Sequence, residues 1–283
     1  MTYGRRSVWR SRLARWRTGL RILCWGSCAV LIGSCSKGPC SNTSFGNGVV
    51  CIRAHGAGSS TANETYRTVA LAPAAGHAVI VAAYQCWDAE CATTGTTELR
   101  VSDNVNDPEP CFTKSPHSPF TLVETSAGAQ HLQQYMWYCP SIPAGVSAFT
   151  LACSAEQSCS YITAWVSEWI GLTPDPTAAA LDTDGGAAST VQGTTASVST
   201  NAATRYTREL IIACGDNTND LTMIPGRPYT VVNQFFPGNL CMARTVSAAG
   251  EVQAATASWK GEDDWYFTIA AIRSAQSVLE PPR

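Results

Sequence analysis

The sequence predicts an all-β protein, a single two-sheet β-sandwich braced by disulfides. Three observations lead to this prediction. Short runs rich in Val, Ile, Thr, Tyr and Trp are separated by Gly, Pro, Asn and Asp, the pattern of strands and turns. Helical periodicity is nearly absent, so the helices that parallel sheets need between their strands are not expected. The 13 cysteines suit a disulfide framework.

The strand pattern is clearest in residues 161–169, where Trp165 and Trp169 fall on one face and Ile162 and Val166 on the other. The expected strands are residues 49–55, 65–71, 77–87, 97–103, 120–125, 131–139, 147–154, 161–170, 209–216, 228–235, 239–247, 251–259 and 265–273. Region 173–207 is expected to be a connection with one strand near 189–199. We therefore expect one domain over 49–273 and a C-terminal tail over 274–283.

The first 34 residues have the composition of a bacterial export signal. Seven arginines and no acidic residue precede the apolar run 22–34, and small residues follow. A transmembrane anchor is the alternative, but it needs about 20 apolar residues, and this run is shorter. We expect residues 1–34 to be a signal peptide.

A cysteine follows this signal in the sequence Ile32-Gly33-Ser34-Cys35, which resembles the lipobox of bacterial lipoproteins. The resemblance implies that Cys35 becomes the lipid-bearing first residue and anchors the chain in a membrane. Ser36 is not the aspartate that retains lipoproteins at the inner membrane, so an outer-membrane or cell-surface location is expected. Residues 35–48 would form a tether. The alternative is a soluble periplasmic or secreted protein.

Charge excludes one class of partner. All 21 acidic residues but only 12 of the 19 basic ones lie after Cys35, so the processed chain would carry a net charge of −9. Nucleic-acid binding requires a basic surface for phosphates. We expect no nucleic-acid partner.

The cysteine count supports export. Without Cys24, Cys28 and Cys35, ten cysteines remain, an even number that fits disulfides formed in an oxidising compartment. The candidates are Cys40, Cys51, Cys86, Cys91, Cys111, Cys139, Cys153, Cys159, Cys214 and Cys241. Cys40–Cys51, Cys153–Cys159 and Cys214–Cys241 are plausible pairs between neighbouring strands. The spacings do not suit a zinc knuckle, and no metal or cofactor is expected.

Several segments from Ala75 onward resemble an uncharacterised domain family of bacterial surface proteins, found in exported proteins and lipoproteins, notably of acidobacteria. The segments include AAGHAVIVAAY, VSDNVND, AWVSEWIGL and ASWKGEDDWYFTIAAIR, and the likeness covers 75–273. The resemblance implies a jelly-roll-like sandwich. It supplies no catalytic residues, and the many cysteines depart from the family pattern.

Catalytic motifs are scarce. There is no G-x-S-x-G elbow, and His55, His77, His117 and His131 are expected to be ordinary strand or surface residues. Glycoside hydrolysis needs two carboxyl groups about 5 to 9 Å apart, a spacing that strand positions i and i+2 provide. Asp88 with Glu90 and Asp182 with Asp184 have that separation in sequence. However, the first pair lies between Cys86 and Cys91, and the second in LDTDGG, which indicates a turn.

Ligand binding is the remaining class of function. The six tryptophans after the signal are Trp87, Trp137, Trp165, Trp169, Trp259 and Trp265. Core packing is expected for most of them, but an exposed aromatic cluster would bind a sugar ring or a protein. The sequence therefore predicts a surface-anchored lipoprotein with a non-catalytic binding or structural role, its ligand a glycan or an envelope protein. A carbohydrate-active enzyme, a glycoside hydrolase or polysaccharide lyase, is the alternative.

Overall fold

The computed structural model describes residues 40–58, 66–86, 99–105, 111–114, 120–122, 132–153, 160–175, 180–189 and 192–279. These residues belong to one compact unit that spans 37–283. The signal region and Cys35 lie outside the described residues. Within the described part of the chain, no helix has the length and apolar character needed to cross a membrane.

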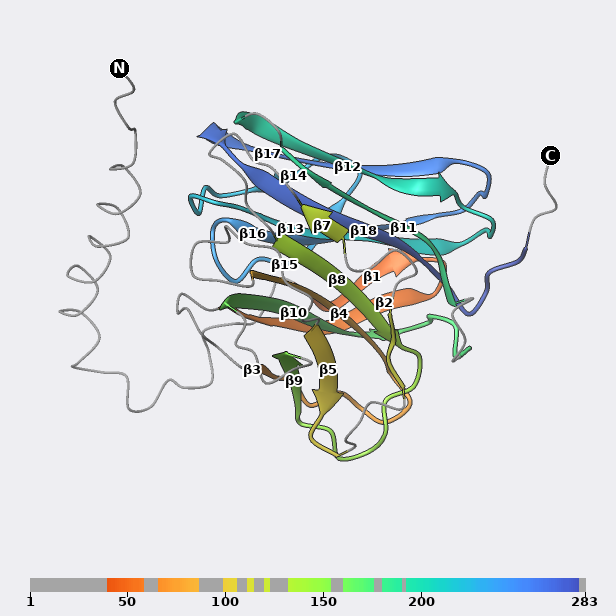
Figure 1. Cartoon of the computed structure of the whole chain (residues 1–283). Coiled ribbons are helices and arrows are strands. Elements are labelled where there is room, and N and C mark those ends of the chain that lie inside the picture. The colour runs from red at the N-terminus through yellow and green to blue at the C-terminus, as the bar shows by residue number, and fades with distance from the viewer. Residues whose placement is uncertain are drawn as a thin grey trace, which may run out of the picture. The chain divides into compact units, whose positions relative to one another are not determined.

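The strands form four antiparallel sheets, which we name after a central strand (Figure 1). The β10 sheet contains β1 (Ser41–Gly46), β2 (Val49–Ala57), β10 (Ser160–Ile170), β4 (Ala78–Cys86), β8 (Leu132–Cys139), β6 (Thr113–Lys114) and β7 (Phe120–Leu122). The β13 sheet contains β11 (Leu181–Ala188), β18 (Trp265–Arg273), β13 (Glu209–Asn217), β16 (Asn239–Val246) and β15 (Thr230–Asn233). The β17 sheet contains β12 (Gly193–Ala203), β17 (Val252–Asp263) and β14 (Ile224–Pro225), and the β9 sheet contains β3 (Tyr66–Ala70), β9 (Ala148–Cys153) and β5 (Leu99–Asp103).

The sheets are stacked in the order β9, β10, β13 and β17 (Figure 1), with an apolar core in each of the three spaces between them. Inner strands supply residues to two cores because successive side chains point to opposite faces. In β4, Ile80 packs toward the β13 sheet and Val79 toward the β9 sheet. In β13, Ile212 packs toward the β10 sheet and Ile211 toward the β17 sheet.

The all-β class and the face-to-face packing of antiparallel sheets are confirmed. The sheets in the described residues number four, whereas two were expected. The reason lies in β4, β13 and β18, whose residues are apolar on both faces. A strand with two apolar faces needs a covering layer on each side. The two large central sheets form a sandwich, and a small sheet covers the outer face of each.

Two segments differ from the expectation. LDTDGG was expected to be a turn, but it lies in β11, where a Cβ on Gly185 would come within 2.0 Å of the Ser199 carbonyl oxygen of β12. Glycine is needed there because the two backbones approach closely. Residues 41–46, expected to be tether, form β1 and pair with β2. Phe45 anchors this strand by packing on Trp169, with ring centroids 5.3 Å apart.

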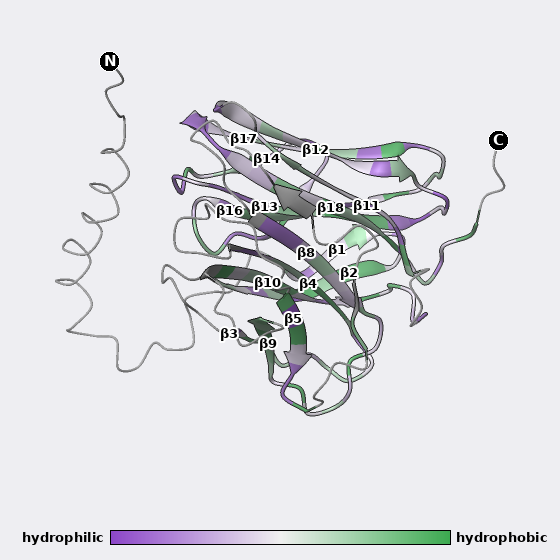
Figure 2. Ribbon diagram, viewed as in Figure 1, coloured by the Kyte–Doolittle hydropathy of each residue, from purple (hydrophilic) through white to green (hydrophobic). Residues whose placement is uncertain are grey.

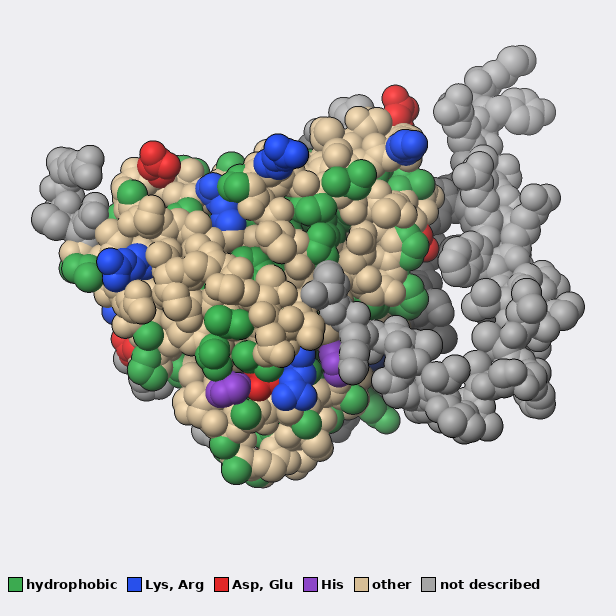
Figure 3. Space-filling view, turned by 180° about the vertical axis from the view of Figure 1, so that it is seen from behind, with side chains coloured by type: hydrophobic (Ala, Val, Ile, Leu, Met, Phe, Trp, Pro, Cys, Tyr) green, Lys and Arg blue, Asp and Glu red, His purple; other side chains and the backbone are tan. Residues whose placement is uncertain are grey.

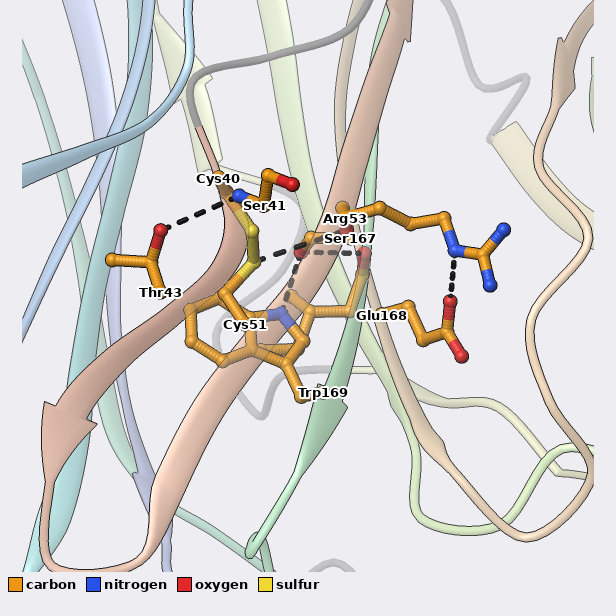
Figure 4. Close-up of a disulfide and its surroundings, with 9 residues drawn as sticks. Cys40, Ser41, Thr43, Cys51, Arg53, Ser167, Glu168 and Trp169 are labelled. Carbon is orange, nitrogen blue, oxygen red and sulfur yellow. Dashed lines mark hydrogen bonds and ion pairs between the residues drawn. A yellow bond between two sulfur atoms is a disulfide. The ribbon is translucent and has the colours of Figure 1, made fainter.

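Three disulfides join described residues. Cys40–Cys51 ties the start of β1 to β2 (Figure 4), Cys214–Cys241 links directly opposed residues of β13 and β16, and Cys111–Cys139 reaches the end of β8. The Cα atoms lie 5.9, 4.1 and 5.0 Å apart, respectively. The first two are pairs expected from the sequence. Cys153 is also disulfide-bonded, whereas Cys91 and Cys159 lie outside the described residues. These bonds indicate an oxidising compartment.

Strand β8 carries a hydrophilic stretch through the interior (Figure 2). Gln133 and Gln134 are buried. Gln85 of the neighbouring strand donates to Gln133 at 3.0 Å and to the Tyr135 hydroxyl at 3.1 Å. The backbone N–H of Leu99 also donates to this hydroxyl. Buried polar side chains are tolerated when they are hydrogen-bonded, and here they link the β10 sheet to the β9 sheet.

Candidate ligand-binding site

The tryptophans are mainly core residues. Trp137, Trp165, Trp169 and Trp259 are at most 6% exposed, and Trp87 lies outside the described residues. Among the described residues, no planar row of exposed tryptophans therefore occurs. Among the described aromatic side chains, the most exposed are Tyr66 at 61% and Phe236 at 50%. Of these two, Phe236 belongs to a larger aromatic group.

That group, the aromatic corner, consists of Tyr84, Trp165, Phe235, Phe236 and Tyr266. It lies at one end of the space between the β10 and β13 sheets. Tyr84 packs on Trp165 and on Tyr266, with ring centroids 5.9 and 4.8 Å apart. Phe235 continues the group, 5.9 Å from Trp165 and 5.0 Å from Phe236. The corner thus extends from the core to an exposed ring.

A glycine in β2 makes room for this arrangement. Gly56 pairs with Trp165 across β2 and β10, and a Cβ on Gly56 would lie 2.0 Å from the ring of Phe235. The phenyl ring therefore packs directly on the β2 backbone. The sequence gives a weak signal for this contact, since an isolated glycine in a strand often marks a close approach.

Polar groups border the aromatic corner on the β13 sheet. Asp216 and Asn239 are opposed in register. Asp216 accepts hydrogen bonds from the Tyr84 hydroxyl at 2.9 Å and from the Asn239 amide at 2.5 Å. Burial raises the pKa of Asp216 to about 7, with a further increase from the charge of Asp220 and an opposing effect from the Tyr84 hydrogen bond. Burial, followed by the charge of Asp216, raises the pKa of Tyr84.

Three buried side chains next to this network have polar atoms without a hydrogen-bond partner in the described structure. They are Trp165 at Nε1, Asn233 at both amide atoms, and Asn239 at Oδ1. Asn233 is fully buried and opposes Cys241 in register. Unpaired buried polar groups cost about 1 to 3 kcal/mol each. Aromatic faces beside amide and carboxyl groups are the chemistry that recognises a polyhydroxylated ring.

The structure separates the expected carboxylate pair Asp182/Asp184. A bulge shifts the register of β11 between Leu181 and Thr183. Thr183 contacts the Ala202 carbonyl oxygen of β12, so Asp184, the next residue, points to the opposite face. Asp182 is instead bound by Arg205, whose Nε lies 2.5 Å from Oδ1. The i, i+2 rule fails here because a bulge breaks the alternation.

Asp182 faces a different acid, Glu209 at the start of β13. Burial raises the pKa of Glu209 to about 9, and the charge of Asp182 adds to this increase. As a carboxylate, Glu209 accepts no hydrogen bond from a described donor; when protonated, it donates to Asp182. This is a buried carboxylic acid–carboxylate pair. The side chains of Asp182 and Glu209 are buried, and Arg205 covers the pair, so it does not form an accessible hydrolytic site.

The remaining candidates from the sequence are the carboxylates Asp88 and Glu90 and two of the histidines. Asp88 and Glu90 lie outside the described residues, as do His117 and His131. Within the residues that the structure covers, no group of three or more His, Cys, Asp or Glu side chains is arranged to hold a metal ion. The aromatic corner is the arrangement of side chains that best suits a ligand.

Comparisons with known proteins do not assign the chain to a family. No family model, no curated protein and no solved structure matches it significantly.

Proposed function

We propose that the protein is an exported lipoprotein, anchored through Cys35 at the outer membrane or cell surface, with a non-catalytic role in binding an envelope glycan. The observation that carries the proposed ligand class is the aromatic corner, where Phe236 is 50% exposed and the buried amide of Asn233 has no described partner. The disulfides support an extracytoplasmic location. The lipid anchor rests on the lipobox resemblance.

The enzyme alternative is less well supported. Glycoside hydrolysis needs two carboxyl groups on either side of the scissile bond. Asp182 and Asp184 point to opposite faces of β11, and Asp182 is engaged by Arg205. We therefore propose binding without turnover.

A binding screen with the full chain, produced in an oxidising compartment, tests this function. The probes are neutral oligosaccharides such as cellotetraose, mannotetraose and chitotetraose, with reducing-end assays for hydrolysis in parallel. We expect binding without product formation. Phe236→Ala should weaken binding about ten-fold, since an exposed aromatic ring of this kind anchors its ligand. Tyr66→Ala, which removes an equally exposed aromatic ring elsewhere, should have no effect.

Two results would count against the proposal. Turnover of any probe would favour the enzyme alternative. Equal affinity of the Phe236 and Tyr66 variants would show that the aromatic corner is not the site. Mass spectrometry of the protein purified from membranes tests the anchor separately, with acyl chains expected on Cys35.

A further inference from the structure

A second cluster lies on the opposite face of the β10 sheet from the aromatic corner. Its centre is Glu168, a fully buried carboxylate in β10. Arg53 Nε lies 2.6 Å from one carboxylate oxygen (Figure 4), and His77 Nδ1 lies 2.7 Å from the other. The backbone N–H of Ala74 donates to the second oxygen at 2.9 Å. The charge of Glu168 is therefore balanced, and the carboxylate orients Arg53 and His77, which are both partly exposed.

The two histidines are held in the same tautomer. A carboxylate is only an acceptor, so His77 donates through Nδ1 to Glu168. His55 lies two residues from Arg53 on the same face of β2, and its Nδ1 donates to the Ala70 carbonyl oxygen. When such a ring is neutral, its Nε2 atom is an acceptor. Neither Nε2 atom has a partner in the described structure.

Arg53 contributes the charge. Its Nε is engaged by Glu168; one of its two terminal nitrogens lies on the side of that carboxylate, and the other points away from it (Figure 4). They form no other hydrogen bond or ion pair with a described residue, and the Arg53 side chain is 44% exposed. In the rear view, histidine and arginine side chains gather on this face of the molecule (Figure 3). We name Arg53, His55 and His77, with Glu168 beneath them, the arginine–histidine patch.

From this geometry we propose that the arginine–histidine patch is a binding site for an acidic sugar, a uronate with a carboxylate beside hydroxyl groups. The outer edge of the Arg53 guanidinium presents two parallel N–H groups, which match a carboxylate. The Nε2 atoms of His55 and His77 accept hydrogen bonds from the neighbouring hydroxyls. A phosphate dianion fits neutral rings less well, because all its oxygens are acceptors and would face two acceptor nitrogens. A metal ion fits less well because the cationic guanidinium of Arg53 is bound to the same carboxylate as His77.

This site is independent of the aromatic corner. Trp165 points toward the β13 sheet, whereas Glu168, three residues further along β10, points toward the β9 side. Loss of one site therefore leaves the other intact, and the two proposals fail separately.

Calorimetry with trigalacturonate and its methyl ester, on the full chain, tests the patch. The methyl ester keeps the hydroxyls but removes the negative charge. We expect trigalacturonate to bind about ten-fold more tightly than the ester. Arg53→Lys keeps the charge but removes the parallel donors, and it should remove that preference. Arg100→Gln, which deletes an exposed cation on β5, is the matched control and should keep it.

Histidine variants separate the contribution of the histidine acceptors from that of the Arg53 donors. Asparagine in place of histidine retains a donor at the Nδ1 position and removes the Nε2 acceptor. His55→Asn and His77→Asn should each weaken trigalacturonate binding about five-fold, the loss of one hydrogen bond. The same variants should leave the binding of acetate unchanged, because acetate has a carboxylate for Arg53 but no hydroxyl group for the histidines.

Equal affinity for trigalacturonate and its ester, or an Arg53→Lys variant that keeps the preference, would overturn the proposal. Tighter binding of an acidic peptide than of trigalacturonate would also overturn it and point to a protein partner. If Arg53→Lys does not fold, as shown by near-ultraviolet circular dichroism, the double variant Arg53→Gln/Glu168→Gln provides the test. It removes both charges together and should lose the preference for the acid while remaining folded.

Discussion

Replacing Glu209 by glutamine is expected to stabilise the protein at neutral pH. Burial and the charge of Asp182 raise the pKa of Glu209 from 4.5 to about 9, so the native state holds a proton that the unfolded chain has released at pH 7. Folding must take up this proton, and the cost is about 3 kcal/mol at pH 7, since each pKa unit corresponds to about 1.4 kcal/mol. Glutamine remains neutral and still donates to Asp182, so it avoids this cost.

The sign of the pH dependence follows from the same shift. Between pH 4.5 and about 9 the native state binds more protons than the unfolded state at this site, so the contribution of Glu209 to stability falls as pH rises. At pH 4 both states are protonated, and the variant should equal the wild type. The free energy of unfolding, measured by guanidinium titration from pH 4 to 9, should diverge in favour of Glu209→Gln as pH rises.

An exposed glutamate provides the control for this prediction. Glu251 lies at the surface before β17, and Glu251→Gln should leave the pH dependence unchanged. The reasoning would be refuted if Glu209→Gln were less stable than the wild type at pH 7. That outcome would mean that the native state holds Glu209 ionised, paired with the nearby arginines.

Three other changes test the packing. Arg53→Met leaves the buried carboxylate of Glu168 without its cation and should cost roughly 2 kcal/mol in guanidinium unfolding, less than for a fully buried pair because Arg53 is 44% exposed. Replacing Cys214 and Cys241 together by alanine opens a loop with a sequence separation of 27 and should cost roughly 3 to 4 kcal/mol; no loss relative to the wild type under oxidising conditions would contradict the bond. Gly56→Val should displace the phenyl ring that packs on it and cost roughly 2 kcal/mol, with a red shift in tryptophan fluorescence; an unchanged spectrum and stability would show that the ring is not held there.

Sequence patterns identified the strands because they report local properties. Alternation of apolar and polar residues, β-branched residues and turn-forming residues do not depend on distant parts of the chain. Each of the thirteen expected segments contains a strand in the structure. Strand β11, in contrast, was not expected from the sequence. Residues 181–188, rich in Asp, Gly and Ala, look like a turn but form β11, because Gly185 allows a close approach to β12 that only the folded chain creates.

The sites depended on contacts that no local pattern contains. Asp182 was paired with Asp184 from spacing alone, but a bulge in β11 separates them and places Asp182 against Glu209 from another strand. A single glutamate within the apolar run that contains Trp165 and Trp169 was a usable signal for Glu168, since a buried charge needs a partner. Nothing in the sequence indicated which partner.

The sequence by itself determined the all-β class, the strand positions, two disulfide pairs and the expectation of export, because these follow from local composition and spacing. The tertiary structure decided how many sheets there are and which side chains meet. Strands that are apolar on both faces require a cover on each side, but only the folded chain shows which strands supply it. Tertiary packing also brought Arg53 and His77, from separate segments, to the two oxygens of Glu168.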